Sequence, residues 1–218
     1  MKPNFAIAIN AFTPVNGGSV DIQSIVVEGE GVTAGAIQIQ TLTSGGETAE
    51  TFYWIPADEV GDYDMEAAGW FDVDNWCVAD KTFADGEGFL TSNDFGDGAT
   101  IMFAGQVADG ATESEISSNF AVAGNCTPVA VDIQSIVVTG EGVTAGAIQI
   151  QTLTSGGETA ETFYWVPADE IGDYDMEEEG WFDVDNWCVA DKTFAAGEGF
   201  LTSNDFGDGA TLKIPSPL

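Results

Sequence analysis

The segment AIQIQTLT, residues 36–43, is the strongest indication of the fold, because apolar residues alternate in it with glutamine or threonine. VDIQSIVV, residues 20–27, alternates in the same way. Side chains of a β-strand point to its two faces in turn, so a period of two predicts strands that are buried on one face. Shorter segments rich in aromatic and β-branched residues are further strand candidates, at residues 51–55, 88–92 and 99–105. Glycine-rich turn sequences separate these segments, and we expect an all-β chain without amphipathic helices.

The same segments occur twice in the chain. Val20 to Ile101 aligns without a gap on Val131 to Leu212, at an offset of 111 residues. Solenoid repeats have periods of about 20 to 50 residues, so this longer period indicates tandem domains. We therefore expect two near-identical β-sandwich or small β-barrel domains, at residues 1–107 and 119–218, joined by an acidic linker at 108–118.

The chain is strongly acidic, with 37 Asp and Glu against four Lys, no Arg and no His, and a net charge of −33. Nucleic acids and anionic membranes would be repelled, and no apolar run is long enough to span a bilayer. Cations, or surfaces that carry them, are the natural partners, although the acids also serve solubility alone. Hydrophobic residues make up 44% of the chain, which supplies a core and argues against disorder.

Cysteine use leaves two alternatives open. Cys77 and Cys188 occupy the same place in the two copies, whereas Cys126 has no counterpart. Cys126 and Cys188 can pair within the second domain, or all three can remain free thiols that pack as small hydrophobes.

One resemblance rests on two short motifs. The order Gly69-Trp70-Phe71-Asp72, Trp76 and then Gly86-Glu87-Gly88-Phe89-Leu90 resembles the Gly-Trp…Gly-x-Gly-Phe pattern of repeated β-modules in bacterial surface and extracellular proteins. The resemblance covers about half of each domain, and its motifs are short. The resemblance implies a display or structural role outside the cell.

The stretch GWFDVDNWCVADKTFA occurs at residues 69–84 and again, unchanged, at 180–195. Its tryptophans favour a core role, since tryptophan usually serves packing. A sugar-stacking platform is the alternative, and it requires a tryptophan held flat at the surface beside Tyr53 or Tyr63. The platform candidates are Tyr53, Trp70, Trp76, Trp181 and Trp187.

Acidic loops are candidates for calcium binding, because calcium takes six to eight oxygen ligands from carboxylates and carbonyls. None of the clusters has the spacing of an EF-hand loop, and a solvated acidic loop is the alternative. The candidate ligands are Asp62, Asp64, Asp72, Asp74, Asp94 and Asp97, with their counterparts Asp173, Asp175, Asp183, Asp185, Asp205 and Asp208.

Enzymatic activity is not expected. Without histidine or arginine the chain cannot assemble the usual serine or cysteine triad, and its glycine-rich turns lack the lysine of a phosphate-binding loop. Acids for a glycosidase-type carboxylate pair are present, but nothing in the sequence pairs them.

We expect a non-enzymatic extracellular structural protein, the subunit of a filament, sheath or surface layer assembled head-to-tail. In this reading the N-terminal strand, with Asn4, Phe5, Ile7 and Ile9, adds to the sheet of a neighbouring copy, or else folds back onto its own domain. The alternative function is a tandem carbohydrate- or calcium-dependent adhesive module, in which duplication supplies avidity.

The expected partners are therefore other copies of the chain, glycans or cations, and neither nucleic acid nor membrane insertion. NFAIAIN, residues 4–10, resembles a signal peptide only superficially, because it reappears as NFAVAGN at 119–125 and so belongs to the fold. A signal sequence removed before this chain begins would fit the expected extracellular or surface-exposed location, on a cell or a virion.

Overall fold

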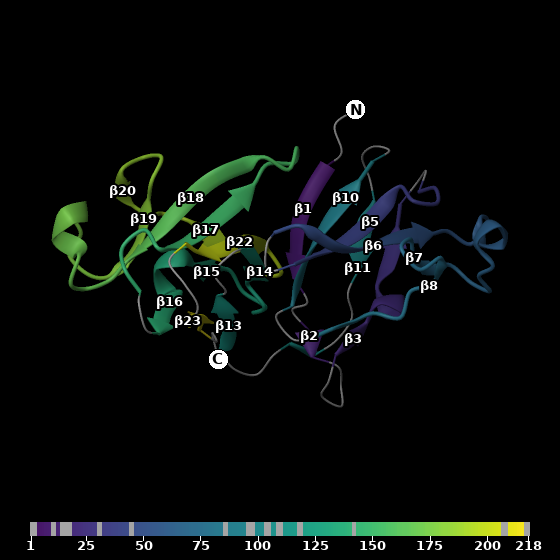
Figure 1. Ribbon diagram of the computed structural model, residues 1–218, viewed down its shortest axis with the longest axis horizontal. Helices are drawn as coiled ribbons and strands as arrows, with labels where there is room; N and C mark the ends of the chain where they lie inside the picture. Colours follow the sequence, from purple (N-terminus) through teal and green to yellow (C-terminus); the bar gives the residue numbers. More distant parts are fainter. Residues whose placement is uncertain are drawn as a thin grey trace.

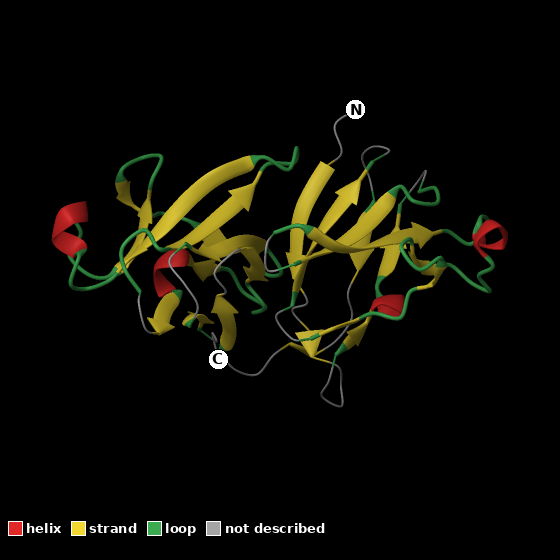
Figure 2. Ribbon diagram, viewed as in Figure 1, coloured by secondary structure: helices red, strands yellow, loops and turns green. Residues whose placement is uncertain are grey.

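The computed structural model of the chain describes residues 4–9, 12–13, 19–29, 32–43, 46–84, 87–94, 99–102, 106–107, 111–116, 120–140, 143–205 and 209–215. Within these residues the chain consists of β-strands and short 3-10 helices, and each half contains a six-stranded sheet (Figures 1 and 2). The expected all-β class with two tandem β-sandwich domains is confirmed. No helix of these residues is long and apolar enough to cross a membrane.

The first domain has a large antiparallel sheet in the order β1-β10-β5-β6-β7-β8. Its strands are β1 (Asn4–Ile9), β10 (Gly88–Asn93), β5 (Ile37–Leu42), β6 (Thr48–Ile55), β7 (Gly69–Asp72) and β8 (Cys77–Val78). Two-stranded ladders complete the domain: β3 (Val20–Asp21) with β9 (Thr82–Phe83), β4 (Val26–Glu28) with β11 (Thr100–Met102), and β2 (Phe12–Thr13) with β12 (Gln106–Val107). Two 3-10 helices are η1 (Ile22–Ser24) and η2 (Val60–Tyr63).

The second domain repeats this plan with the sheet order β14-β22-β17-β18-β19-β20. Its strands are β14 (Phe120–Gly124), β22 (Gly199–Asn204), β17 (Ile148–Leu153), β18 (Thr159–Val166), β19 (Gly180–Asp183) and β20 (Cys188–Val189). A three-stranded ladder joins β13 (Thr112–Ile116), β23 (Ala210–Ile214) and β16 (Val137–Gly140), and β15 (Val131–Asp132) pairs with β21 (Thr193–Phe194). The 3-10 helices are η3 (Ile133–Ser135) and η4 (Ile171–Tyr174).

The predicted period of two is confirmed in β5. Ile37 and Ile39 are buried, while Gln38 and Gln40 between them are half-buried. Ile39 stands opposite Phe52 of β6, and both pack in one core cluster that also takes side chains from β3, η1 and β4. The core therefore lies between the large sheet and the short ladders.

The segment VDIQSIVV is not one continuous strand as we expected. Its first two residues form β3, the next three form η1, and β4 begins at Val26. The Asp21 carboxylate accepts the backbone N–H of Gln23, and Ser24 Oγ donates to the backbone oxygen of Asp21. These local hydrogen bonds stabilise a turn inside an alternating sequence.

The N-terminal strand is paired within its own domain. β1 runs antiparallel to β10, from Asn4 opposite Asn93 to Ile9 opposite Gly88, and Phe5 and Ile7 lie between. This pairing is the alternative that we left open, in which the strand folds back onto its own domain, and addition of the strand to a neighbouring copy stays a prediction. The physical reason is that folding back satisfies the ladder hydrogen bonds without loss of translational freedom.

The segment at 108–118 is not simply a linker. Within it, Thr112–Ile116 form β13, which pairs with β23 from Thr112 opposite Ile214 to Ile116 opposite Ala210. Ile116 is 1% exposed and belongs to the core of the second domain. We expected a linker because the segment is polar. It forms a strand instead, because its backbone pairs with β23 and its apolar residue Ile116 packs in the core. Residues 108–110, 117 and 118 lie outside the described residues.

None of the three cysteines forms a disulfide. Cys126 is buried, whereas Cys77 and Cys188 are exposed. The proposed pairing of Cys126 with Cys188 is therefore absent, and Cys126 packs as a small hydrophobe.

The two domains meet through equivalent strands. β1 lies against β14 and β22, and β14 in turn lies against β10. Ile7 fills the space that a Cβ on Gly199 would need, and Val122, the counterpart of Ile7, does the same at Gly88. These reciprocal contacts relate the domains by an approximate two-fold axis, and they leave the other ends of the domains pointing in opposite directions (Figure 1).

Candidate functional site

Trp70 and Trp181 lie at the centres of the two cores. Both are 0% exposed, and the ring N–H groups donate to the backbone oxygens of Ile25 and Ile136, each at 2.8 Å. Trp54 packs edge-on against Trp70 with ring centroids 5.5 Å apart. The core interpretation is confirmed for these two residues, and the platform prediction is corrected for them because neither ring offers a face to a ligand.

Trp76 and Trp187 have the opposite environment. Each is 76% exposed and each ends the four-residue turn that joins the last two strands of its large sheet. Their φ angles are 54° and 52°, in the left-handed region. That conformation costs a residue with a Cβ about 1–2 kcal/mol, and burial of the ring does not offset the cost here. Each ring contacts Phe71 or Phe182 along one edge and leaves most of its surface exposed, which makes Trp76 and Trp187 the candidates for ligand contact.

Asp72 holds this turn. One of its carboxylate oxygens accepts the backbone N–H groups of Asp74 and Asn75, both at 2.9 Å. The other oxygen accepts the side-chain amide of Asn75 at 2.8 Å. Asp183 makes the same three hydrogen bonds in the second domain. These carboxylates therefore position the exposed tryptophans.

Trp76 adjoins further aromatic side chains on the face of the large sheet turned away from the main core. The Phe71 ring lies 5.8 Å from Trp76 and 5.1 Å from Tyr63, with edge-to-face geometry in both pairs. In the sheet ladder Tyr53 stands opposite both Phe71 and Gln38, so these side chains share one face. We call this set of side chains the aromatic row: Gln38, Tyr53, Tyr63, Phe71 and Trp76 in the first domain, and Gln149, Tyr164, Tyr174, Phe182 and Trp187 in the second. Phe71 and Phe182 are only 3% exposed and pack in small buried clusters, so the tyrosines and tryptophans form the accessible part of each row.

Polar groups border each aromatic row. The Gln38 side-chain amide donates to an Asp94 carboxylate oxygen at 2.7 Å, and Gln149 donates to Asp205 at 2.6 Å. In the second domain the other Asp205 carboxylate oxygen accepts the Ser203 hydroxyl at 3.4 Å, and the Gln149 amide oxygen accepts the Gln151 side-chain amide at 3.3 Å. The sequence analysis missed Gln38 and Phe71 as members of the site, because their placement depends on the pairing of β5, β6 and β7, which no single segment encodes.

The two aromatic rows lie far apart. Each includes the tyrosine of a 3-10 helix, and Figure 2 shows η2 and η4 at the two ends of the molecule. The domain seam lies between them (Figure 1). One molecule therefore presents two equivalent surfaces, one near each end (Figures 1 and 2).

The calcium candidates do not form a cluster within the described residues. Asp72 and Asp183 cap turns, Asp74 accepts the N–H of Thr51, and Asp94 and Asp205 accept glutamine amides. Asp62, Asp64, Asp173 and Asp175 lie in or next to η2 and η4, whereas Asp97 and Asp208 fall outside the described residues. No group of three or more Asp, Glu, Cys or His that could hold a metal occurs in that part of the chain. Calcium binding stays a prediction, and a larger rise of Tm with millimolar calcium than with sodium of equal ionic strength tests it.

The described lysines are engaged in ion pairs. Lys81 lies 3.2 Å from Glu50 and 3.3 Å from Glu87. Burial alone would lower the pKa of Lys81, but Glu87 and Glu50 together outweigh it and raise the pKa above its ordinary value. Lys192 pairs with Glu161 at 2.6 Å and Lys213 with Glu113 at 3.0 Å. Each of these amines therefore takes part in an ion pair with at least one glutamate.

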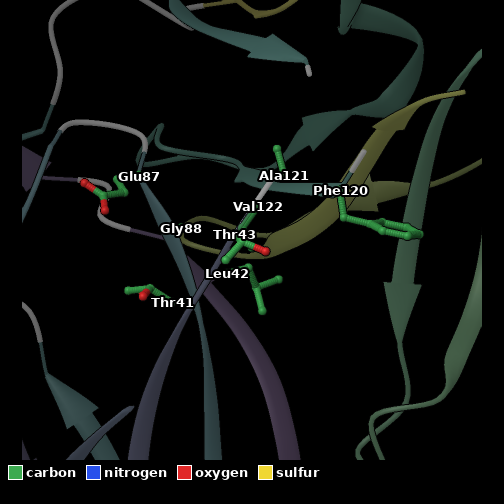
Figure 3. Close-up of a pocket in the computed structure, with 8 residues that line it drawn as sticks. All are labelled: Thr41, Leu42, Thr43, Glu87, Gly88, Phe120, Ala121 and Val122. Carbon is green, nitrogen blue, oxygen red and sulfur yellow. The ribbon is translucent and has the colours of Figure 1, made fainter. Parts of the chain in front are cut away.

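A pocket of about 200 Å³ lies at the domain seam (Figure 3). It is lined by Thr41, Leu42, Thr43, Glu87 and Gly88 of the first domain and by Phe120, Ala121 and Val122 of the second. The Glu87 carboxylate already binds Lys81 and the backbone N–H of Ala84. Glu87, the charged side chain of this lining, is therefore already paired, and the aromatic rows are the better candidate sites.

Comparisons with known proteins identify no relative. No family model, no curated protein and no solved structure matches the chain.

Proposed function

We propose that the chain is a non-enzymatic carbohydrate-binding protein whose two aromatic rows each bind a glycan segment. The observation that carries this proposal is the 76% exposure of Trp76 and Trp187 on turns held in a left-handed conformation. A flat indole ring packs well against the apolar C–H face of a sugar ring, and it loses little conformational entropy when it does so.

The surroundings of the rings support sugar over a purely apolar ligand. The Tyr53 ring and the Gln38–Asp94 pair lie in the same row, and they offer donors and acceptors for hydroxyl groups. A net charge of −33 disfavours acidic polysaccharides, so neutral or amino-sugar glycans are the favoured class.

The two-ended geometry supports an adhesive role. Two sites near opposite ends of one molecule (Figure 2) can hold two separate glycan chains, and on a dense surface the second site gains from a high effective concentration. We propose an extracellular or surface-exposed location, which is where such glycans occur. The resemblance to bacterial surface modules and the acid-rich, soluble surface support the same location.

Affinity electrophoresis in gels that contain neutral polysaccharides tests the proposal. We expect the wild type to be retarded, Trp76→Ala or Trp187→Ala to be retarded much less, and the double variant to run as in an empty gel. Val129→Ala, which alters an exposed apolar side chain away from both rows, is the matched control and keeps full retardation. Equal retardation of the double variant and the wild type would contradict the proposal.

The filament, sheath or surface-layer subunit that we expected first stays a prediction. The strand expected to join copies is paired within its own domain, so the geometry gives more support to glycan binding. Negative-stain microscopy of concentrated protein tests assembly directly, and head-to-tail polymers there would favour the structural role.

A further inference from the structure

The two domains differ at one sheet edge. In the second domain β23 pairs with β16 on one side and with β13 on the other. The first-domain counterparts are β11 and β4, which pair in the same register as β23 and β16. Among the described residues, β11 has no strand on its second side.

The two domains also differ in side-chain burial along this edge. Ala210 and Leu212 of β23 are 1% and 0% exposed. Their counterparts Ala99 and Ile101 are only partly buried, although both pack against the core of the first domain. Ile116 of β13 stands opposite Ala210 and closes the core of the second domain at this point. The equivalent place beside Ala99 lacks such a residue among the described ones.

We propose that the outer edge of β11, residues Ala99–Met102, is a docking edge for an extended polypeptide strand of a partner, in the geometry of β13. The strand would run antiparallel to β11 and place an aliphatic residue beside Ala99, as Ile116 lies beside Ala210. Main-chain hydrogen bonds would supply the affinity. The aliphatic residue would fix the register of the bound strand against β11.

Charge complementarity defines the partner further. In the second domain Glu113 of β13 forms an ion pair with Lys213 of β23 at 3.0 Å. The first-domain counterpart of Lys213 is Met102, which is 38% exposed and offers no cation. The chain carries a net charge of −33, so an acidic strand is repelled and a basic residue at the Glu113 position is favoured. The partner segment is therefore a β-strand with a basic residue at the Glu113 position and a β-branched aliphatic residue three positions after it.

Synthetic peptides added to the full chain test this docking edge. The probe is ATKSEISS, the sequence of residues 111–118 with Glu113→Lys, and the matched peptides are the unchanged ATESEISS and ATKPEISS. Hydrogen exchange measured by mass spectrometry should slow at residues 100–102 with ATKSEISS. It should remain unchanged at residues 211–213, where β13 already occupies the edge. The proline peptide should bind at least about tenfold more weakly, because proline removes a ladder donor and its ring disrupts the pairing.

A variant of the protein completes the experiment. Met102→Lys introduces the residue that the second domain already carries at this position, so the fold should tolerate it. We expect the variant to reverse the preference, with ATESEISS bound about two- to fivefold more tightly than ATKSEISS. The proposal is wrong if millimolar ATKSEISS leaves exchange at residues 100–102 unchanged, if the proline peptide protects them equally, or if Met102→Lys leaves the preference unaltered.

Discussion

The two domains have nearly the same sequence but are not equally complete. Seven aligned pairs differ between Val20–Ile101 and Val131–Leu212, yet Leu212 is fully buried while Ile101 is partly exposed. The exchange of isoleucine for leucine does not account for this, because both are aliphatic and of similar volume. The difference comes from β13, which lies outside the repeated segment and covers only the second domain. Complete burial of the core of a β-sandwich therefore depends on flanking strands as well as on the sequence of the repeated segment.

The largest expected effect is the loss of stability when the buried tryptophan that both domains share is removed. Trp70→Ala and Trp181→Ala should each lower the free energy of unfolding of their own domain by about 3–5 kcal/mol, because each removes a fully buried ring. Denaturant unfolding followed by circular dichroism measures the loss. Trp76→Ala and Trp187→Ala are the controls and should change stability by less than about 0.5 kcal/mol. A large loss for the exposed pair would refute the assignment of the two tryptophan environments.

The next effect concerns the strand that distinguishes the domains. Ile116→Ala should destabilise the second domain by about 2–4 kcal/mol, since it leaves a cavity beside Ala210. Hydrogen exchange at residues 210–214 should become as fast as at residues 99–102. Glu113→Ala removes only an exposed ion pair and should cost less than about 1 kcal/mol. If exchange in β23 were unaffected by Ile116→Ala, β13 would not be the cause of the difference.

A smaller, symmetric effect is expected at the turns. Asp72→Ala and Asp183→Ala should each cost about 1–3 kcal/mol, because backbone N–H groups of the turn lose a charged acceptor. Glycan retardation should fall together with stability, since Trp76 and Trp187 lose their fixed placement. Asp72→Asn keeps an acceptor oxygen and should retain most of both properties. Unchanged retardation in Asp72→Ala would show that the carboxylate does not position the ring.

The smallest effect is a pH dependence. The folded-state pKa of Lys81 lies above its unfolded value, so its ion pairs stabilise the fold fully below the unfolded pKa. This contribution is lost as the pH rises through the folded pKa, in the alkaline range above about 10.4. Lys81→Met should therefore lower stability at neutral pH by less than about 1 kcal/mol and flatten the alkaline decline. A parallel shift of the whole pH profile, with an unaltered alkaline slope, would contradict this origin.

The sequence allowed the fold to be predicted where burial follows alternation. Ile37, Ile39, Phe52 and Trp54 lie in the core as the period of two requires. The prediction of one continuous strand over VDIQSIVV was wrong. Asp21 and Ser24 make hydrogen bonds that form a turn, and the alternation of apolar residues gives no sign of these bonds. β13 was missed because its anchoring depends on the edge of β23, which lies about a hundred residues further along the chain.

The candidate site could be predicted in part. Trp76 and Tyr53 were both candidates, but separating Trp76 from Trp70 required the turn held by Asp72. The acids that we grouped as calcium ligands are neighbours in sequence, and several of them instead accept hydrogen bonds from separate backbone and glutamine groups. Sequence proximity of carboxylates is a poor guide to their convergence, because adjacent side chains in extended or turn segments point apart.

The reciprocal seam has a consequence for how the two copies can diverge. Gly199 of one domain accommodates Ile7 of the other, and Gly88 accommodates Val122. Mutation of either glycine to a larger residue is harmful because of a side chain encoded in the other copy. Each copy therefore restricts which residues the other copy can carry at Gly88 and Gly199.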